Sequence, residues 1–190
     1  MQIFLIKTAE IEDLIFINLK NMLTPIQLFI SGNDIFPGNK LPVLHYKKAL
    51  RLPWLFRARK VKSIFIKHNW TNNWRNGIYT YHHYHSNTHE AMAVIKCHTV
   101  LLLGGENGKH LLLEKGDIIV IPAGVAHKNL GKEKDVICIG GYPEGKDFDM
   151  NYGNPGERPG TDENICSLPV PLTGPLYGES DPLVKIWNIL

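Results

Sequence analysis

Two histidine-rich segments carry the side chains of this chain that are best suited to chemistry. The first runs from His82 to Glu90 and the second from Gly116 to His127. Together they can supply three imidazoles and a carboxylate at spacings that allow four side chains to meet one divalent ion. Imidazole and carboxylate are the ligands that Zn, Fe, Mn, Ni and Cu accept. The first hypothesis is therefore a metal site.

Strand periodicity selects among the histidines of the first segment. His83 and His85 are two residues apart, so on a strand their imidazoles share one face and can meet one ion. His82 and Tyr84 then point to the opposite face. We expect His82 and His89 to lie outside the set of direct ligands.

The other two ligands need turns to reach the same ion. Glu90 is five residues after His85, the wrong parity for one continuous strand, so residues 86–88 must bend the chain. His127 follows a turn at residues 122–124 that can swing it back over the sheet. The predicted metal ligands are His83, His85, Glu90 and His127. Three histidines and one carboxylate leave positions open on a six-coordinate ion, as a catalytic or ligand-binding site requires.

Two tyrosines and the carboxylate are candidates for further roles. Tyr79 and Tyr81 have the same strand parity as His83. We expect Tyr79 to fill the core, and Tyr81 to line the pocket and donate a hydrogen bond to a substrate. Glu90 could leave the ion or act as a base if burial and charge tune its pKa. The predicted catalytic residues are therefore Glu90 and Tyr81.

The composition is that of a globular protein. Of the 190 residues, 44% are hydrophobic and 21% are charged, and this length suits one domain with a proper core. The 17 glycines and 12 prolines indicate many turns, which favour short strands over long helices.

The charge distribution is uneven, although the net charge is only +3. Residues 35–89 contain no Asp or Glu but many Lys and Arg. Such a block could attract anionic substrates, phosphate or RNA. We favour a solvated face that is balanced by acids nearer the C-terminus. We therefore expect a small-molecule ligand and neither nucleic acid nor a membrane as partner.

The cysteines and the N-terminus bear on location. Cys97, Cys138 and Cys166 are scattered and form no CxxC pair, which argues against a disulfide framework and for a reducing compartment. The apolar stretch at residues 1–6 is short and acids follow it closely, so it is neither a secretory signal nor a membrane span. We expect a soluble, cytoplasmic protein.

Hydrophobic periodicity predicts an all-β domain. Short strands are expected at 26–30, 41–46, 78–85, 90–96, 98–103, 110–113, 118–121 and 136–139. Pro42 places the second of these at a sheet edge. A short helix is expected at 60–70, and the Pro- and Gly-rich tail is expected to end in a strand at 183–187. This many short strands with glycine turns indicates an antiparallel sandwich or barrel.

The spacing of two motifs resembles that of the cupin superfamily. Gly77-x5-His83-x-His85-x4-Glu90 matches its first motif, and Gly116-x5-Pro122-x-Gly124-x2-His127 matches its second. Each fixed position matches by chance about one time in twenty, so the joint match is hard to obtain by accident. The resemblance implies a single jelly-roll (double-stranded β-helix) barrel with a metal inside, and a homodimer by fold analogy.

Two positions depart from the cupin motifs. Cys97 stands where a glycine usually follows the first motif, and Gly131 stands where an asparagine usually ends the second. Neither is a ligand, so the metal site is unaffected. The conformation of the turn at Cys97 is less certain to follow the motif, because the glycine usual there allows a positive φ angle.

More closely, residues 22–190 resemble the uncharacterised bacterial YjlB-like cupins. The likeness rests on residues 41–44, 74–79, 82–90, 122–128, 141–145 and 155–159. It leaves out residues 1–21, which we interpret as an N-terminal extension to a single cupin domain at 22–190. Met22 is then an alternative start, which N-terminal sequencing of the native protein would decide. This family has no assigned reaction, so the resemblance implies no specific activity.

These features favour a metal-dependent enzyme, of dioxygenase or isomerase type, that acts on a small polar molecule. Its cofactor would be a divalent transition metal such as Fe, Mn, Ni or Zn. The alternative is a non-catalytic small-ligand-binding or sensor cupin. Cupin regulators normally carry a helix-turn-helix segment, and none is visible in the sequence. A storage or scaffolding protein would not need converging ligands, so this class fits least well.

Overall fold

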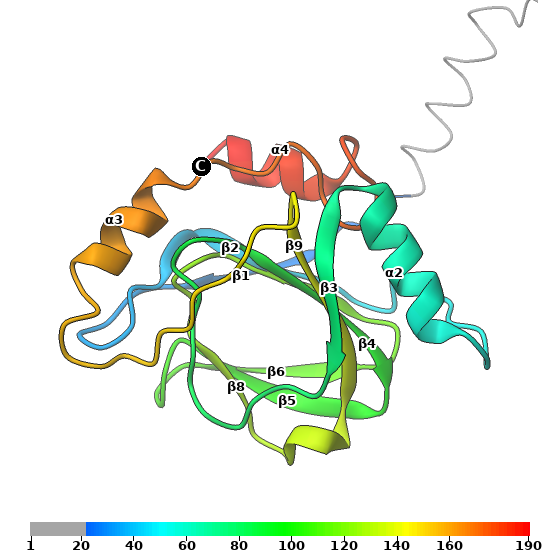
Figure 1. Ribbon diagram of the computed structural model, residues 1–190, viewed down its shortest axis with the longest axis horizontal. Helices are drawn as coiled ribbons and strands as arrows, with labels where there is room; N and C mark the ends of the chain where they lie inside the picture. The colour runs from blue at the N-terminus through cyan, green and yellow to red at the C-terminus, as the bar shows by residue number, and fades with distance from the viewer. Residues whose placement is uncertain (1–21) are drawn as a thin grey trace, which may run out of the picture.

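The computed structural model describes residues 22–190, and the extension expected at residues 1–21 lies outside the described residues. Nine strands of the described chain form two antiparallel sheets. The larger sheet has the spatial order β1 (Ile26–Ile30), β2 (Asn39–Tyr46), β7 (Ile118–Ile121), β4 (Glu90–Lys96), β9 (Ile137–Pro143) and β3 (Trp70–Asn76). The smaller sheet has the order β6 (Lys109–Glu114), β5 (His98–Leu103) and β8 (His127–Asn129). The sheets face each other across a barrel interior (Figure 1), which confirms the all-β jelly-roll prediction.

The helices lie outside the barrel. They are α2 (Arg57–Lys67), α3 (Gly160–Ser167) and α4 (Pro182–Asn188), with a 3-10 turn, η1, at Glu133–Asp135. In Figure 1, α2 and α4 lie along the outer face of the larger sheet and α3 lies to one side, and the outer face of the smaller sheet carries none of these three helices. Within residues 22–190, no helix is long and apolar enough to cross a membrane.

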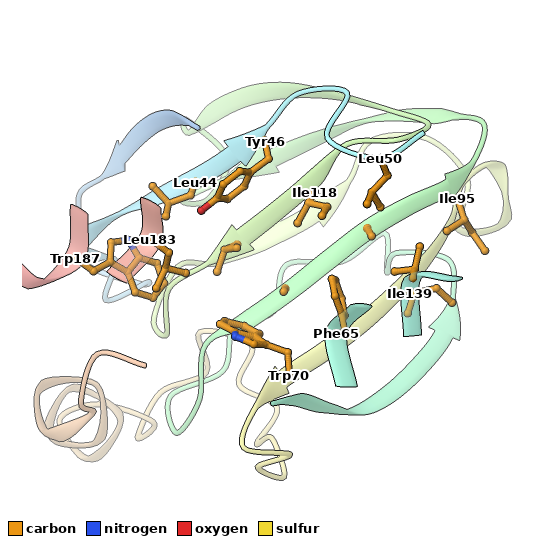
Figure 2. Close-up of a cluster of buried hydrophobic side chains, with 14 of the residues drawn as sticks. Leu44, Tyr46, Leu50, Phe65, Trp70, Ile95, Ile118, Ile139, Leu183 and Trp187 are labelled. Carbon is orange, nitrogen blue, oxygen red and sulfur yellow. The ribbon is translucent and has the colours of Figure 1, made fainter. Parts of the chain in front are cut away.

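Strand β4 separates two hydrophobic clusters, because successive side chains point to opposite faces of a sheet. Ala93 and Ile95 join the outer cluster, where Phe65 of α2 and Trp187 of α4 cover the larger sheet (Figure 2). Met92, in contrast, belongs to the inner cluster between the sheets. This double burial explains why the strand is apolar throughout, and it leaves Glu90 as a carboxylate at the end of a buried strand.

The predicted strand at 78–85 is wrong. The chain pairs earlier, as β3, and residues 77–89 form a connection with isolated bridges at His83 and Tyr84. The polar sequence of β3 gave little sign of a strand. Its pairing with β9 supplies the ladder, from Trp70 opposite Pro143 to Asn76 opposite Cys138, and such long-range pairing overrides local propensity.

The predicted terminal strand at 183–187 is also wrong, because this segment is helix α4. The Asp181 side chain accepts a hydrogen bond from the backbone N–H of Leu183 at 3.0 Å, and Pro182 occupies the first turn. An aspartate cap followed by proline is a helix start signal. Leu183 and Trp187, four residues apart, then bury the same face of the helix.

The edge position predicted for the second strand is a further error, because β2 lies between β1 and β7. Pro42 is tolerated there since neither ladder uses its position. The pairing with β1 shifts register between Leu28 and Ile30, and the pairing with β7 begins at Leu44. Proline is found inside a sheet at such irregularities.

The turn after β4 keeps the backbone conformation that glycine usually provides at this position. Cys97 itself adopts a positive φ of 58° there.

Candidate metal centre

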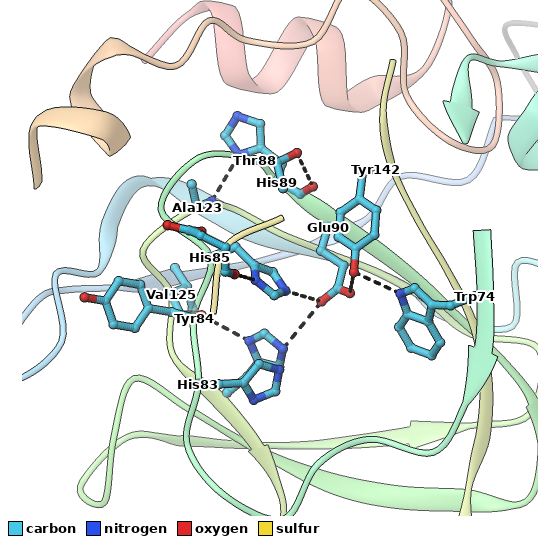
Figure 3. A network of polar contacts seen from close by, with 12 residues as sticks. Trp74, His83, Tyr84, His85, Thr88, His89, Glu90, Ala123, Val125 and Tyr142 are labelled. Carbon is cyan, nitrogen blue, oxygen red and sulfur yellow. Dashed lines mark hydrogen bonds and ion pairs between the residues drawn. The ribbon is translucent and has the colours of Figure 1, made fainter. Parts of the chain in front are cut away.

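The four predicted ligands come together at one end of the barrel interior. Glu90 begins β4 of the larger sheet and His127 begins β8 of the smaller one. His83 is fixed beside His127 by two backbone hydrogen bonds, of 3.2 and 2.9 Å. The backbone of His85 accepts a hydrogen bond from Gly124 N–H at 2.8 Å. All four side chains are buried, with exposures of 5% or less. Figure 3 shows His85 turned toward Glu90, with Tyr142 and Trp74 on the other side of the carboxylate.

One carboxylate oxygen is the meeting point. Glu90 Oε2 lies 3.6 Å from His85 Nε2 and 3.5 Å from His127 Nε2. The ring of His83 completes the group, with its centroid 4.2 Å from that of His127 and 5.7 Å from that of His85. The arrangement therefore places two imidazoles against one acid, with a third imidazole beside them.

Backbone carbonyls fix the tautomer of each imidazole. His83 Nδ1 lies 3.3 Å from Tyr81 O, His85 Nδ1 lies 2.5 Å from Asp149 O, and His127 Nδ1 lies 3.2 Å from Val125 O. A carbonyl can only accept, so each Nδ1 carries a proton. Nε2 of a neutral ring then has a lone pair, and Nε2 of a protonated ring can donate. Histidines that bind metal are oriented by this kind of bond.

This arrangement fits a cation. Two Nε2 lone pairs face a carboxylate oxygen, so acceptors meet acceptors unless a proton or a metal ion stands between them. Two ligands bound at about 2.1 Å with a tetrahedral angle between them lie about 3.4 Å apart, close to the separations at Glu90. Within residues 22–190, no three His, Cys, Asp or Glu side chains already stand at the spacing of a bound ion. Binding would therefore involve some closing of the side chains, with His83 the one that must approach.

The electrostatics keep the carboxylate charged. Burial acts to raise the pKa of Glu90, but hydrogen bonds and charge from His127 and His85 outweigh it and hold that pKa well below its usual range. Burial lowers the pKa of His83 to about 3, with a contribution from His127 beside it. His83 is thus neutral at ordinary pH, which leaves its Nε2 free for a cation.

A tyrosine that the sequence reasoning missed orients the carboxylate. Tyr142 on β9 donates its hydroxyl to Glu90 Oε1 at 2.9 Å, and the same hydroxyl accepts from Trp74 Nε1 of β3 at 3.0 Å. Burial raises the pKa of Tyr142, so it remains a donor. Gly140 lies directly against the Trp74 ring, and a Cβ there would meet it at 2.0 Å. This approach between β9 and β3 exists only in the folded chain, so the sequence carried no signal for Tyr142.

Asp149 is the second missed residue. Its backbone carbonyl faces His85, while its carboxylate accepts from the backbone N–H of Ser86 at 2.7 Å and from Ser86 Oγ at 2.5 Å. Burial acts to raise the pKa of Asp149, but these hydrogen bonds and one from Asn151 hold it below its usual value. Asp149 thus fixes the backbone next to His85, although it lies more than sixty residues later in the sequence. No local sequence pattern reveals this contact.

The expectations for the tyrosines are reversed. Tyr79 lines the cavity and is 37% exposed, whereas Tyr81 is 45% exposed and lies outside the cavity wall. The two rings stack at 4.9 Å. Strand parity failed here because residues 77–89 are a connection and not a strand. The geometry therefore does not favour Tyr81 as a catalytic residue.

The two remaining histidines of the first segment lie outside the ligand group. His82 Nε2 approaches the exposed Glu106 carboxylate at 3.3 Å. His89 is buried, accepts a hydrogen bond from Ala123 N–H at 3.1 Å, and packs against Trp187 with ring centroids 4.9 Å apart. Burial lowers its pKa to about 4. His89 is a structural residue between the barrel and α4.

A cavity of about 200 Å³ opens beside the four ligands. Apart from those ligands, it is lined by amides, aromatic rings and apolar side chains: Asn72, Asn73, Trp74, Asn76, Gly77, Ile78, Tyr79, Met92, Tyr142, Phe148 and Met150. A small molecule in this space would lie directly against the ligand group.

Sequence comparison identifies a clear relative. No protein-family model matches the chain. The uncharacterised protein YjlB of Bacillus subtilis is 38% identical over 146 residues, which cover 77% of this chain and 86% of YjlB.

Comparison with solved structures returns weaker similarities. Acireductone dioxygenase from Bacillus anthracis, with cadmium in its active centre, has a TM-score of 0.35 at 16% identity, covering 48% of this chain and 63% of that one. A DUF861 family protein from Thermotoga maritima has a TM-score of 0.30 at 22% identity, with coverages of 46% and 90%. Oxalate decarboxylase from Bacillus subtilis, described with Mn(II) centres, has a TM-score of 0.33 at 15% identity, with coverages of 58% and 27%. Scores this low establish no shared function.

Proposed function

Because this chain belongs to the cupin superfamily, as a relative of YjlB, we propose that it is a metal-dependent enzyme acting on a small molecule. The metal ligands in this proposal are His83, His85, Glu90 and His127. The metal is a divalent transition ion such as Fe, Mn, Ni or Zn, and the reaction is of dioxygenase or isomerase type.

One observation carries the proposal: three backbone carbonyls bind the Nδ1 atoms of the three histidines. The three Nε2 lone pairs are thereby left for another partner, beside a carboxylate that also can only accept. A metal ion can bind all three Nε2 atoms and the carboxylate at once, whereas a proton on Nε2 of His85 pairs only that ring with Glu90.

The chain's own groups then have distinct tasks. A bound ion would supply Lewis-acid polarisation of a substrate oxygen. Tyr142 holds Glu90 Oε1, so that Oε2 stays directed at the histidines. Glu90 is the group best placed to accept a proton within the cavity, while Tyr142 and Trp74 position it.

Elemental analysis after loading with Fe(II), Mn(II), Ni(II) or Zn(II) and desalting tests the proposal. We expect about one ion per chain in the wild type, and a loss of at least about tenfold in retained metal after His127→Ala or His83→Ala. His110→Ala, which removes an exposed imidazole on β6, is the matched control and should retain the ion. Equal metal content in all variants would rule out this ligand set.

A non-catalytic ligand-binding or sensor cupin is the competing function. Turnover on diols, hydroxy acids or sugars by the loaded protein supports the enzyme. Small-molecule binding that survives both chelation and His83→Ala supports the sensor.

We also propose that residues 22–190 form one cupin domain that pairs as a homodimer. The edge strand β1 supports this, because Ile26 and Phe29 on it are 51% and 50% exposed. An exposed apolar edge strand is a template for pairing with another chain.

A further inference from the structure

The charge inside the cavity limits what it can bind. Among the side chains that line it, all within residues 22–190, Glu90 is the one acidic group, and Lys and Arg are absent. The nearest basic residue in sequence, Arg75, is turned away because it alternates with Trp74 along β3. Arg75 lies opposite Ile139 of the outer cluster and contributes to a depression on the outer surface with Trp54 and Phe56.

From this we infer the ligand class of the site: a small molecule with one anionic, metal-binding end and an uncharged, largely apolar body. The inference rests on the proposed function. A divalent ion and the Glu90 carboxylate together leave one positive charge, which one anionic group neutralises. A second anionic group placed against this lining would have no cation to pair with, which is costly where it loses water.

The aromatic and thioether side chains beside the ligands indicate the apolar body. Phe148 stacks on Tyr142 with centroids 4.8 Å apart and lies 5.0 Å from the His85 ring. Trp74, Met92 and Met150 also line the cavity. Aromatic and thioether groups bind flat or branched apolar groups through dispersion and ring contacts.

The size of the cavity sets an upper limit. Its volume of about 200 Å³ corresponds to about seven water molecules at about 30 Å³ each. Pockets for drug-sized ligands measure roughly 300–1,000 Å³. The ligand is thus smaller than a typical drug-sized molecule. Separately, the charge of the cavity excludes sugar phosphates and dicarboxylates.

Three α-hydroxy acids test the ligand class, because they share the metal-binding end and differ in the body. Lactate has a methyl group, mandelate a phenyl ring and malate a second carboxylate. Titration into metal-loaded wild-type protein, followed by calorimetry, should give mandelate an affinity at least about tenfold above that of malate, with lactate between them. Metal content is measured on the same samples.

The outcomes separate the two proposals. Protein that retains its metal but binds malate as well as mandelate, or binds none of the three acids, overturns the ligand class and leaves the metal site standing. Protein that retains no metal overturns the proposed function itself.

A substitution at the cavity wall provides a second test. Phe148 is 41% exposed, so Phe148→Arg can add a cation to the wall without opening the core. We expect malate affinity to rise, and mandelate affinity to fall, each by about tenfold. Leu112→Arg, at a position 48% exposed on the remote strand β6, is the matched control and should leave the preference for mandelate unchanged. An unchanged preference in Phe148→Arg would contradict the proposed wall.

Discussion

At the scale of single residues, Glu90 is where the two halves of the site meet. One oxygen faces two imidazoles and the other is held by Tyr142, which Trp74 holds in turn. The histidines are oriented from behind by carbonyls of the chain. The direction of the donor atoms therefore depends on groups that would not themselves touch an ion.

Removing the Tyr142 hydroxyl should weaken metal binding. Tyr142→Phe keeps the ring and deletes the hydrogen bond to Glu90 Oε1, so we expect metal affinity to fall by about tenfold or more. Competition with a chromogenic chelator measures it. Tyr152→Phe, at a residue 45% exposed and outside the ligand group, should bind metal as the wild type does. An unchanged affinity in Tyr142→Phe would show that the carboxylate needs no such support.

The metal-free protein should lose stability as pH rises, and Glu90→Gln should abolish that loss. Burial acts to lower the pKa of His85, but Glu90 outweighs it and raises the pKa above the ordinary 6.5. The resulting stabilisation is fully present below pH 6.5 and is lost as pH rises through the raised value. In Glu90→Gln the amide can donate to an imidazole lone pair instead, which removes the pH dependence.

Urea unfolding of chelated protein at several pH values between about 6 and 9 checks this expectation. The free energy of unfolding should fall with pH in the wild type and stay flatter in Glu90→Gln. Parallel curves would mean that Glu90 does not control the protonation of His85.

At the scale of elements, the inner strands hold the site through close backbone contacts. Strands β4, β7 and β9 are neighbours in the larger sheet, and β4 carries Glu90 while β9 carries Tyr142. Gly140 of β9 lets β3 place Trp74 directly over it. The smaller sheet contributes His127 through the turn at Gly124, which has a positive φ of 81°.

A side chain at Gly140 should disturb this arrangement. In Gly140→Ala the new Cβ would meet the Trp74 ring at 2.0 Å, so Trp74 must move and release Tyr142. We expect a loss of about 1–3 kcal/mol in the free energy of unfolding, together with weaker metal binding. Chemical denaturation and chelator competition measure the two effects. Gly160→Ala, where nothing lies within 4 Å of the new Cβ, should be close to neutral, and similar losses in both variants would contradict the packing argument.

At the scale of the whole molecule, the ligand group joins the two sheets, since Glu90 and His127 begin strands of different sheets. Helices α2 and α4 cover the larger sheet (Figure 1), and β1 is left as an edge with exposed apolar side chains. The site faces inward and this edge faces outward, so metal binding and self-association should be separable.

The homodimer proposal predicts such a separation. Phe29→Lys places a charge on the edge strand, a substitution that blocks strand pairing between chains. Size-exclusion chromatography with light scattering should show a wild-type dimer and a monomeric variant, with equal metal content in both. A wild type that stays monomeric at every concentration would overturn the homodimer. A dimeric variant would place the interface elsewhere.

The sequence by itself determined the residue types at the site and most of the strands around it. The continuous apolar run from Ala91 to Ile95, the short run from Ile118 to Ile121 and the motif spacings are local features, so local patterns suffice to find them. Strand parity also selected His83 and His85, although the strand it assumed does not exist.

Only the tertiary structure decided the rest. Tyr142 reaches Glu90 across 52 residues of sequence, and Asp149 reaches Ser86 across 63. The tautomers of the histidines and the pairing of β3 likewise depend on partners brought close by folding. Helix α4 is different, because its start signals, an aspartate cap and a proline, are local features of the sequence. The short apolar run that follows them nevertheless predicts a strand. Spacing along the chain fixes which side chains can share a face, but the direction of a lone pair is set by whatever folding places behind the ring.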